Sequence, residues 1–125
     1  MFTEKVFVCG TLRRGGSNHR LLRASRRLGE WVTPKAYRML DLGAYPGVID
    51  GTDSIRGEVY AVSPAVLRRL DALEDHPWRY RRRRLDTPWG AAWIYIHRAP
   101  VRRPRRIAGG DWLARRAGCD RGRIA

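Results

Sequence analysis

Residues 55–75 read IRGEVYAVSPAVLRRLDALED, and this stretch decides the fold. The apolar and β-branched residues over 55–62 predict a strand. Ser63 can cap a helix that has Pro64 in its first turn, so we expect a helix over 64–75. His76 and Pro77 end this helix. The centre of the chain is therefore predicted to be a strand that passes directly into a helix.

The predicted helix places a carboxylate among its apolar side chains. On a helical wheel, one apolar arc contains Val66, Leu67, Leu70 and Leu73. Glu74 falls inside this arc, and Asp71 lies at its edge. Burial of an ionised carboxylate is costly and raises its pKa toward the range useful for general acid–base catalysis. A glutamate at a helix end can equally point outward or pair with an arginine, so both interpretations of Glu74 stay open.

A glycine-rich loop follows the first predicted strand. The segment KVFVCGTLRRGG, residues 5–16, belongs to a strand over 4–9 and a loop over 10–16. This loop is either a hairpin turn or a segment that offers its backbone N–H groups to an anion. It lacks the glycine spacing of a P-loop and of a dinucleotide-binding motif, so the signal for an anion is unspecific.

The remaining segments predict a mixed α+β class. We expect a helix over 17–29, capped by Ser17 and ended by Gly29, because Leu21, Leu22 and Leu28 form a helical stripe. A strand over 30–40 that Pro34 interrupts is expected to follow. Residues 42–54 are rich in turn formers. Two strands over 79–87 and 91–97 are predicted to form a hairpin, and the tail after residue 99 is predicted to dock through Trp112.

Composition limits the classes of protein that fit. A chain of 125 residues with two cysteines predicts one domain without a disulfide framework or a zinc site. No signal peptide and no membrane span is evident, so a cytoplasmic protein is expected. The net charge of +14 is typical of nucleic-acid binding, but 24 of the 26 basic residues are arginines scattered along the chain. A basic surface without a polyanion partner is therefore the simpler interpretation. Because residues 79–84 and 102–106 are dense in arginine, a binder of RNA or another polyanion is kept as the alternative function.

Other reactive side chains give weaker signals. Cys9 is a candidate nucleophile with His19 or His76 as its base, although a small residue at a strand end is the simpler interpretation. His97 alternates with Trp93 and Tyr95 on one face of its predicted strand, where packing is the default role.

Several of these segments together resemble the gamma-glutamyl cyclotransferase-like family. They are KVFVCGTLRRGGSNHRLL, AYPGVI, IRGEVYAVSPAVLRRLDALEDHPWRYRR, AAWIYIH and IAGGDWL. The resemblance spans nearly the whole chain and is strongest to the gamma-glutamylamine cyclotransferase branch, which includes the enzyme of butirosin biosynthesis. It implies a small mixed β-barrel flanked by helices, formed by residues 1–114. From their own composition, residues 115–125 are expected to be a loose tail.

The resemblance also implies a site and a reaction. It places the catalytic glutamate on Glu74 and the substrate-binding loop on Cys9, Gly10, Thr11 and Leu12. Tyr45, Tyr95 and Trp93 are weaker candidates for the pocket walls. The resemblance implies a small gamma-glutamyl substrate that cyclises to 5-oxoproline, with no metal and no organic cofactor. The family usually has tyrosine where this chain has Cys9, which leaves open a member that kept the fold and lost catalysis. The pattern leaves the leaving amine and the oligomeric state undetermined.

Overall fold

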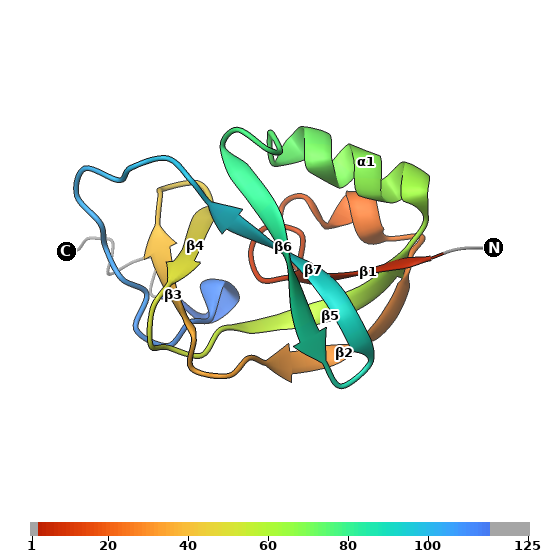
Figure 1. Ribbon diagram of the computed structural model, residues 1–125, viewed down its shortest axis with the longest axis horizontal. Helices are drawn as coiled ribbons and strands as arrows, with labels where there is room; N and C mark the ends of the chain where they lie inside the picture. Colours follow the sequence, from red (N-terminus) through yellow and green to blue (C-terminus); the bar gives the residue numbers. More distant parts are fainter. Residues whose placement is uncertain (1–2, 116–125) are drawn as a thin grey trace.

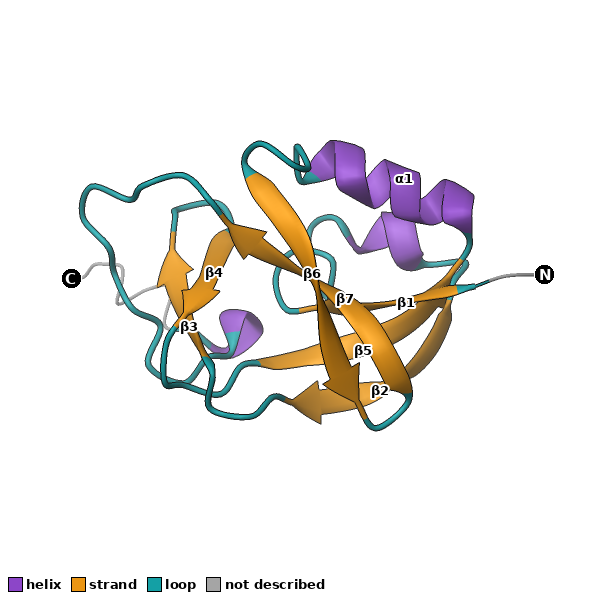
Figure 2. Cartoon of the chain, in the orientation of Figure 1, coloured by secondary structure: helices purple, strands orange, loops and turns teal. Residues whose placement is uncertain are grey.

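The computed structural model describes residues 3–115, and its class is α+β as expected (Figure 1). One α-helix and a 3-10 turn lie together at one side of the strands, as Figure 2 shows. In chain order the elements are β1 (Glu4–Val8), η1 (His19–Leu22), β2 (Arg26–Val32), β3 (Tyr37–Asp41), β4 (Pro46–Asp50), β5 (Arg56–Val62), α1 (Pro64–Leu73), β6 (Tyr80–Thr87), β7 (Gly90–His97) and η2 (Trp112–Ala114).

The strands are hydrogen-bonded as two sheets. The larger sheet has the order β2-β5-β1-β7-β6, and β3 and β4 form a separate two-stranded sheet. All neighbours in the larger sheet are antiparallel except β1 and β7, which run parallel with Val6 opposite Trp93. The first strand thus lies at the centre of the sheet, and the glycine-rich loop leaves from its carboxyl end.

Two groups of buried side chains pack on the two faces of the larger sheet. Alternation along β1 sends Val6 and Val8 into one cluster and Phe7 into the other. The first cluster also contains Leu67 and Leu70 of α1. The second is completed by side chains from β3, β4 and the C-terminal segment, namely Met39, Val48 and Trp112. The predicted docking of Trp112 is therefore confirmed, since this side chain is buried.

Helix α1 begins as expected and ends two residues early. The Ser63 hydroxyl accepts a hydrogen bond from the Val66 N–H at 3.1 Å, and Pro64 is the first helical residue. The last helical residue is Leu73, so Glu74 is the C-cap and donates its N–H to the Leu70 carbonyl at 2.9 Å. Asp75 follows with a φ of 52°, which turns the chain away from the helix axis.

The helix predicted over 17–29 is wrong. Only the 3-10 turn η1 forms there, and the chain then enters β2, an edge strand paired with β5. The leucines that suggested one helical face belong to different clusters, because Leu22 packs with the first and Leu28 with the second. Gly29 lies at a register shift inside β2, where a Cβ would meet the Trp89 ring at 2.5 Å. The glycine thus permits close packing and does not end a helix.

Two further segments differ from the expectation in detail. Residues 42–54, which the sequence marks as rich in turn formers, contain the strand β4. It pairs antiparallel with β3, from Tyr37 opposite Asp50 to Asp41 opposite Pro46. The strand predicted over 30–40 is interrupted at Pro34 as expected and divides into the end of β2 and the whole of β3. The hairpin of β6 and β7 is confirmed. Apart from Arg115, the predicted loose tail lies outside the described residues. Over residues 3–115, no helix has the length and apolar character that crossing a membrane requires.

Candidate active site

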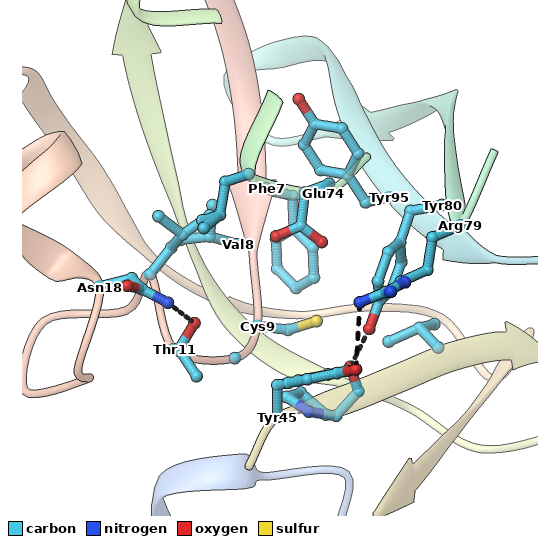
Figure 3. A pocket seen from close by; sticks show the side chains of 15 residues that line it. Phe7, Val8, Cys9, Thr11, Asn18, Tyr45, Glu74, Arg79, Tyr80 and Tyr95 are labelled. Carbon is cyan, nitrogen blue, oxygen red and sulfur yellow. Dashed lines mark hydrogen bonds between the residues drawn. The ribbon is translucent and has the colours of Figure 1, made fainter. Parts of the chain in front are cut away.

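A cavity of about 180 Å³ opens at the carboxyl end of β1 (Figure 3). The loop after β1, the end of α1, the start of β4 and the hairpin of β6 and β7 all contribute to it. Its walls include the predicted catalytic glutamate, the four predicted loop residues and both tyrosines predicted as walls: Cys9, Gly10, Thr11, Leu12, Tyr45, Glu74 and Tyr95. Residues far apart in the sequence therefore meet around one cavity.

The sequence interpretation both missed and misplaced residues of this cavity. Asn18, Arg79 and Tyr80 also line it. Asn18 could have been found, because it is the second residue after the glycine-rich loop, whereas nothing in the pattern marks Arg79. Trp93, a weaker candidate for the wall, lies elsewhere, because the guanidinium groups of Arg82 and Arg84 stack on its ring at 4.4 Å and 4.0 Å.

The carboxyl of Glu74 is partly buried in this cavity without a protein partner. Within residues 3–115, no group donates a hydrogen bond to it and no cation pairs with it. Desolvation raises its pKa from the ordinary 4.5 to about 7. Its place at the C-terminal end of α1, where the helix dipole is negative, acts in the same direction. Near neutral pH this carboxyl can therefore both accept and release a proton.

The loop after β1 presents a set of unused backbone donors. Two turn hydrogen bonds shape it, from Arg13 N–H to the Gly10 carbonyl at 3.1 Å and from Asn18 N–H to the Thr11 carbonyl at 2.9 Å. The N–H groups of Gly10, Thr11 and Leu12 donate to no acceptor within the described part of the chain. Consecutive free N–H groups in a turn form a concavity suited to an anion.

Side chains of the loop add a further hydrogen-bond donor and fix the loop's shape. The Asn18 amide donates to the Thr11 hydroxyl at 2.9 Å, which leaves the hydroxyl hydrogen of Thr11 free to donate (Figure 3). Gly16 is required because a Cβ there would lie 2.3 Å from the Thr11 carbonyl oxygen. The loop is thus tightly closed behind the residues that face the cavity.

The tyrosine hydroxyls of the wall are engaged with other groups. Tyr80 donates to the Pro46 carbonyl at 2.8 Å, and Tyr95 donates to Asp71 at 2.7 Å. Burial, together with nearby carboxylates, raises the pKa of both phenols, so they stay neutral. In Figure 3 the Tyr95 hydroxyl points away from Glu74, so the ring rather than the hydroxyl faces the cavity.

Cys9 is poorly suited to act as a nucleophile here. Desolvation and the charge of Glu74 raise the pKa of its thiol to about 12, against an opposing effect of Arg13. Neither candidate base contacts it: the His19 ring nitrogen lies 3.0 Å from the Leu12 carbonyl, and His76 accepts from the Arg82 N–H. Cys9 instead fills the floor of the cavity next to Glu74, as Figure 3 shows.

Charged groups elsewhere in the described residues do not form a second centre. Over residues 3–115, no three His, Cys, Asp or Glu side chains are grouped as a metal site would need. The arginine run of β6 is largely paired, and the ion pairs are Arg82 with Asp71, Arg83 with Asp50 and Arg84 with Glu4. These pairs weaken the case for β6 as a polyanion-binding surface.

Comparison with known proteins identifies the class. Residues 6–114 match the family described as "Gamma-glutamyl cyclotransferase, AIG2-like", so the chain belongs to this family. A relative from Vibrio cholerae, whose name places it among the gamma-glutamylcyclotransferases, is 50% identical over 110 residues, covering 88% of this chain and 96% of its own. The gamma-L-glutamyl-butirosin B gamma-glutamyl cyclotransferase of Niallia circulans is 35% identical over 77 residues, covering 61% of this chain and 49% of its own.

Solved structures show the same fold. The solution structure of ytfP from Escherichia coli superimposes with a TM-score of 0.72 at 36% identity, covering 88% of this chain and 96% of its own. The crystal structure of PH0828 from Pyrococcus horikoshii gives a TM-score of 0.76 at 28% identity, covering 87% and 89% of the two chains. The resemblance found in the sequence is therefore confirmed at the level of family and fold.

Proposed function

We propose that this protein is a gamma-glutamyl cyclotransferase that converts a gamma-glutamyl amide into 5-oxoproline and a free amine. The observation that carries the proposal is the unpaired Glu74 carboxyl, which shares one cavity with the free N–H groups of Gly10, Thr11 and Leu12. The names of relatives that match most of the chain support the same activity.

The loop binds the α-carboxylate of the substrate in this proposal. Its free N–H groups donate to the carboxylate oxygens, and the Thr11 hydroxyl adds a further donor. Fixing the carboxylate aims the substrate's α-amine at its own side-chain carbonyl. Orientation of such an intramolecular attack can supply about 7–11 kcal/mol of the barrier, so no nucleophile from the protein is needed.

Glu74 moves the protons in this scheme. Its carboxylate first takes a proton from the substrate's α-ammonium group. The freed amine attacks the γ-carbonyl carbon and forms a new C–N bond, and the amine nitrogen releases its further proton to solvent water. As the bond from the γ-carbon to the leaving nitrogen breaks, the protonated carboxyl returns a proton to that nitrogen. A carboxyl with a pKa of about 7 is suited to both directions of transfer.

Two aromatic rings and one cation complete the proposed pocket. The rings of Tyr45 and Tyr95 form its walls. Arg79 lies at the mouth, with its Nη1 3.4 Å from the Tyr45 hydroxyl and no carboxylate partner within residues 3–115. In Figure 3, Thr11 and Arg79 lie on opposite sides of Glu74. A substrate anchored at the loop would therefore extend its leaving group toward Arg79, which favours a leaving amine that carries a carboxylate.

Product formation from a small panel tests this proposal. The protein would be incubated with gamma-glutamyl amino acids, a gamma-glutamyl polyamine and gamma-glutamyl-lysine, and 5-oxoproline would be followed by mass spectrometry. Release of 5-oxoproline together with an equal amount of free amine is expected for at least one compound. Formation of free glutamate in its place would indicate hydrolysis and contradict the proposed intramolecular attack.

A further inference from the structure

Arg13 follows the substrate loop directly, and its side chain is buried. Only 4% of the residue is exposed, which is rare for an arginine. Its guanidinium meets carboxylates from three separate parts of the chain: Glu58 of β5 at 3.1 Å, Asp111 at 2.7 Å and Glu30 of β2 at 3.3 Å. A buried cation with this many partners fixes the position of the chain that carries it.

Glu58 binds the backbone of the loop as well as the Arg13 side chain. Its second oxygen accepts the N–H of Arg14 at 2.9 Å and the hydroxyl of Tyr60 at 2.9 Å. The side chain and the backbone of residues 13–14 are thus attached to one carboxylate on the central strand pair. Hydrogen bonds to Glu58 lower its pKa against the opposing effect of burial, so it stays charged. The free N–H groups of Gly10, Thr11 and Leu12 lie immediately before this fixed point.

Asp111 brings the C-terminal segment into the same network. It caps η2 through a hydrogen bond from the Ala114 N–H and also lies 3.5 Å from Arg56. Its neighbour Trp112 is buried in the second core cluster, so the carboxylate is held by a docked segment. None of Asp111, Glu58 and Glu30 lines the cavity, so none can contact a substrate there.

We propose that Arg13 is a positioning residue for the substrate loop and that Asp111, from the far end of the described chain, sets its position. The proposal rests on the proposed function, because it assigns the loop N–H groups a role in binding the α-carboxylate. Loss of the Asp111 charge weakens the contact to one arm of the guanidinium, and the loop residues with free N–H groups are then held less firmly in place. A misplacement of about 1 Å can cost about 100-fold in rate.

A matched pair of variants separates positioning from general stability. Asp111→Asn keeps the shape of the side chain and its ability to cap η2 but removes the charge. Asp53→Asn is the control. Asp53 forms an ion pair with Arg106 at 2.8 Å, so it also attaches the C-terminal segment to the rest of the fold. It contacts neither the loop nor Arg13. Arg13→Lys retains the charge but loses the planar fork.

The test has two readouts, and the second is independent of the proposed activity. The first is kcat and KM for 5-oxoproline formation. The second is the set of ¹⁵N order parameters and amide exchange rates of Gly10, Thr11 and Leu12, which requires no substrate. For Asp111→Asn and Arg13→Lys we expect KM to rise about tenfold or more, together with greater mobility of these amides. For Asp53→Asn we expect changes within about twofold and unchanged amides.

Equal effects of Asp111→Asn and Asp53→Asn would overturn the positioning role, as would unchanged loop amides in Asp111→Asn. If the wild-type protein forms no 5-oxoproline, the proposed function fails, and the amide measurements alone decide the inference. Selective loosening of the loop amides in Asp111→Asn and Arg13→Lys would then still support it.

Discussion

Replacing Glu74 with glutamine should make the protein more stable at neutral pH. The free carboxyl ionises near pH 4.5 in an unfolded chain, whereas burial moves its pKa to about 7 in the folded protein. Between these two values the folded state binds one more proton than the unfolded state, so the free energy of unfolding falls as the pH rises. Above about pH 7 the loss is complete and amounts to about 3 kcal/mol.

The expected result is that the difference in free energy of unfolding between Glu74→Gln and the wild type changes with pH. Near pH 4 the Glu74 carboxyl of the folded wild type is neutral, so no buried charge lowers its free energy of unfolding. At pH 8 this carboxyl is ionised, and its buried charge lowers the free energy of unfolding by the full amount. The advantage of Glu74→Gln over the wild type should therefore grow by about 3 kcal/mol between pH 4 and pH 8. Carboxyls with lowered pKa values, such as Asp71 and Glu58, destabilise both proteins alike in acid and cancel from the difference.

Urea unfolding followed by tryptophan fluorescence at several pH values measures this difference. Asp75→Asn serves as the control, because it removes an exposed carboxyl at the same helix end, and asparagine tolerates the φ of 52° found there. The effect of Glu74→Gln beyond that of Asp75→Asn is the effect of burial. Parallel stability curves for Glu74→Gln and the wild type would refute the reasoning, since they would mean that the carboxyl is hydrated in the folded protein.

Two further predictions concern other groups of the cavity. In a Cys119→Ser background, Cys9 should react with iodoacetamide at pH 8 at least about 100-fold more slowly than in the unfolded chain, because burial raises the pKa of its thiol to about 12. Equal rates in the two states would show that the thiol is hydrated. We measure the preference for gamma-glutamyl-alanine over gamma-glutamyl-putrescine as a ratio of kcat/KM values. Arg79→Ala should reduce this ratio by up to about fivefold. Arg81→Ala is the control and should leave the ratio unchanged, because Arg81 lies outside the cavity. An unchanged ratio in Arg79→Ala would place the leaving group elsewhere.

Local signals in the sequence were sufficient where one segment decides its own structure. The helix cap at Ser63, the apolar and β-branched residues of β5 and the hairpin of β6 and β7 predicted those elements within two residues. The wheel position of Glu74 indicated an inward carboxyl even though the helix ends before it. Its side chain still faces the cavity, because the C-cap residue retains helical backbone angles.

Elements that depend on partners distant in the sequence were missed. Leu21 and Leu28 have helical spacing, yet they pack against different faces of the sheet, and nothing in their spacing reveals this. The strand β4 looked like a turn because it begins with Pro46 and Gly47, and only its pairing with β3 makes it a strand. The family resemblance supplied the candidate site residues of the loop, whereas Arg79 and the partners of Arg13 required the fold.

The rate of 5-oxoproline formation by Glu74→Gln tests the central claim most directly. Glutamine keeps the shape of the side chain and cannot carry a proton between the attacking and leaving nitrogens. On an active substrate we expect the variant to retain binding, measured by calorimetry, and to lose at least about 100-fold in kcat. A kcat within a few-fold of the wild-type value would contradict the assignment of Glu74 as the proton-transferring group.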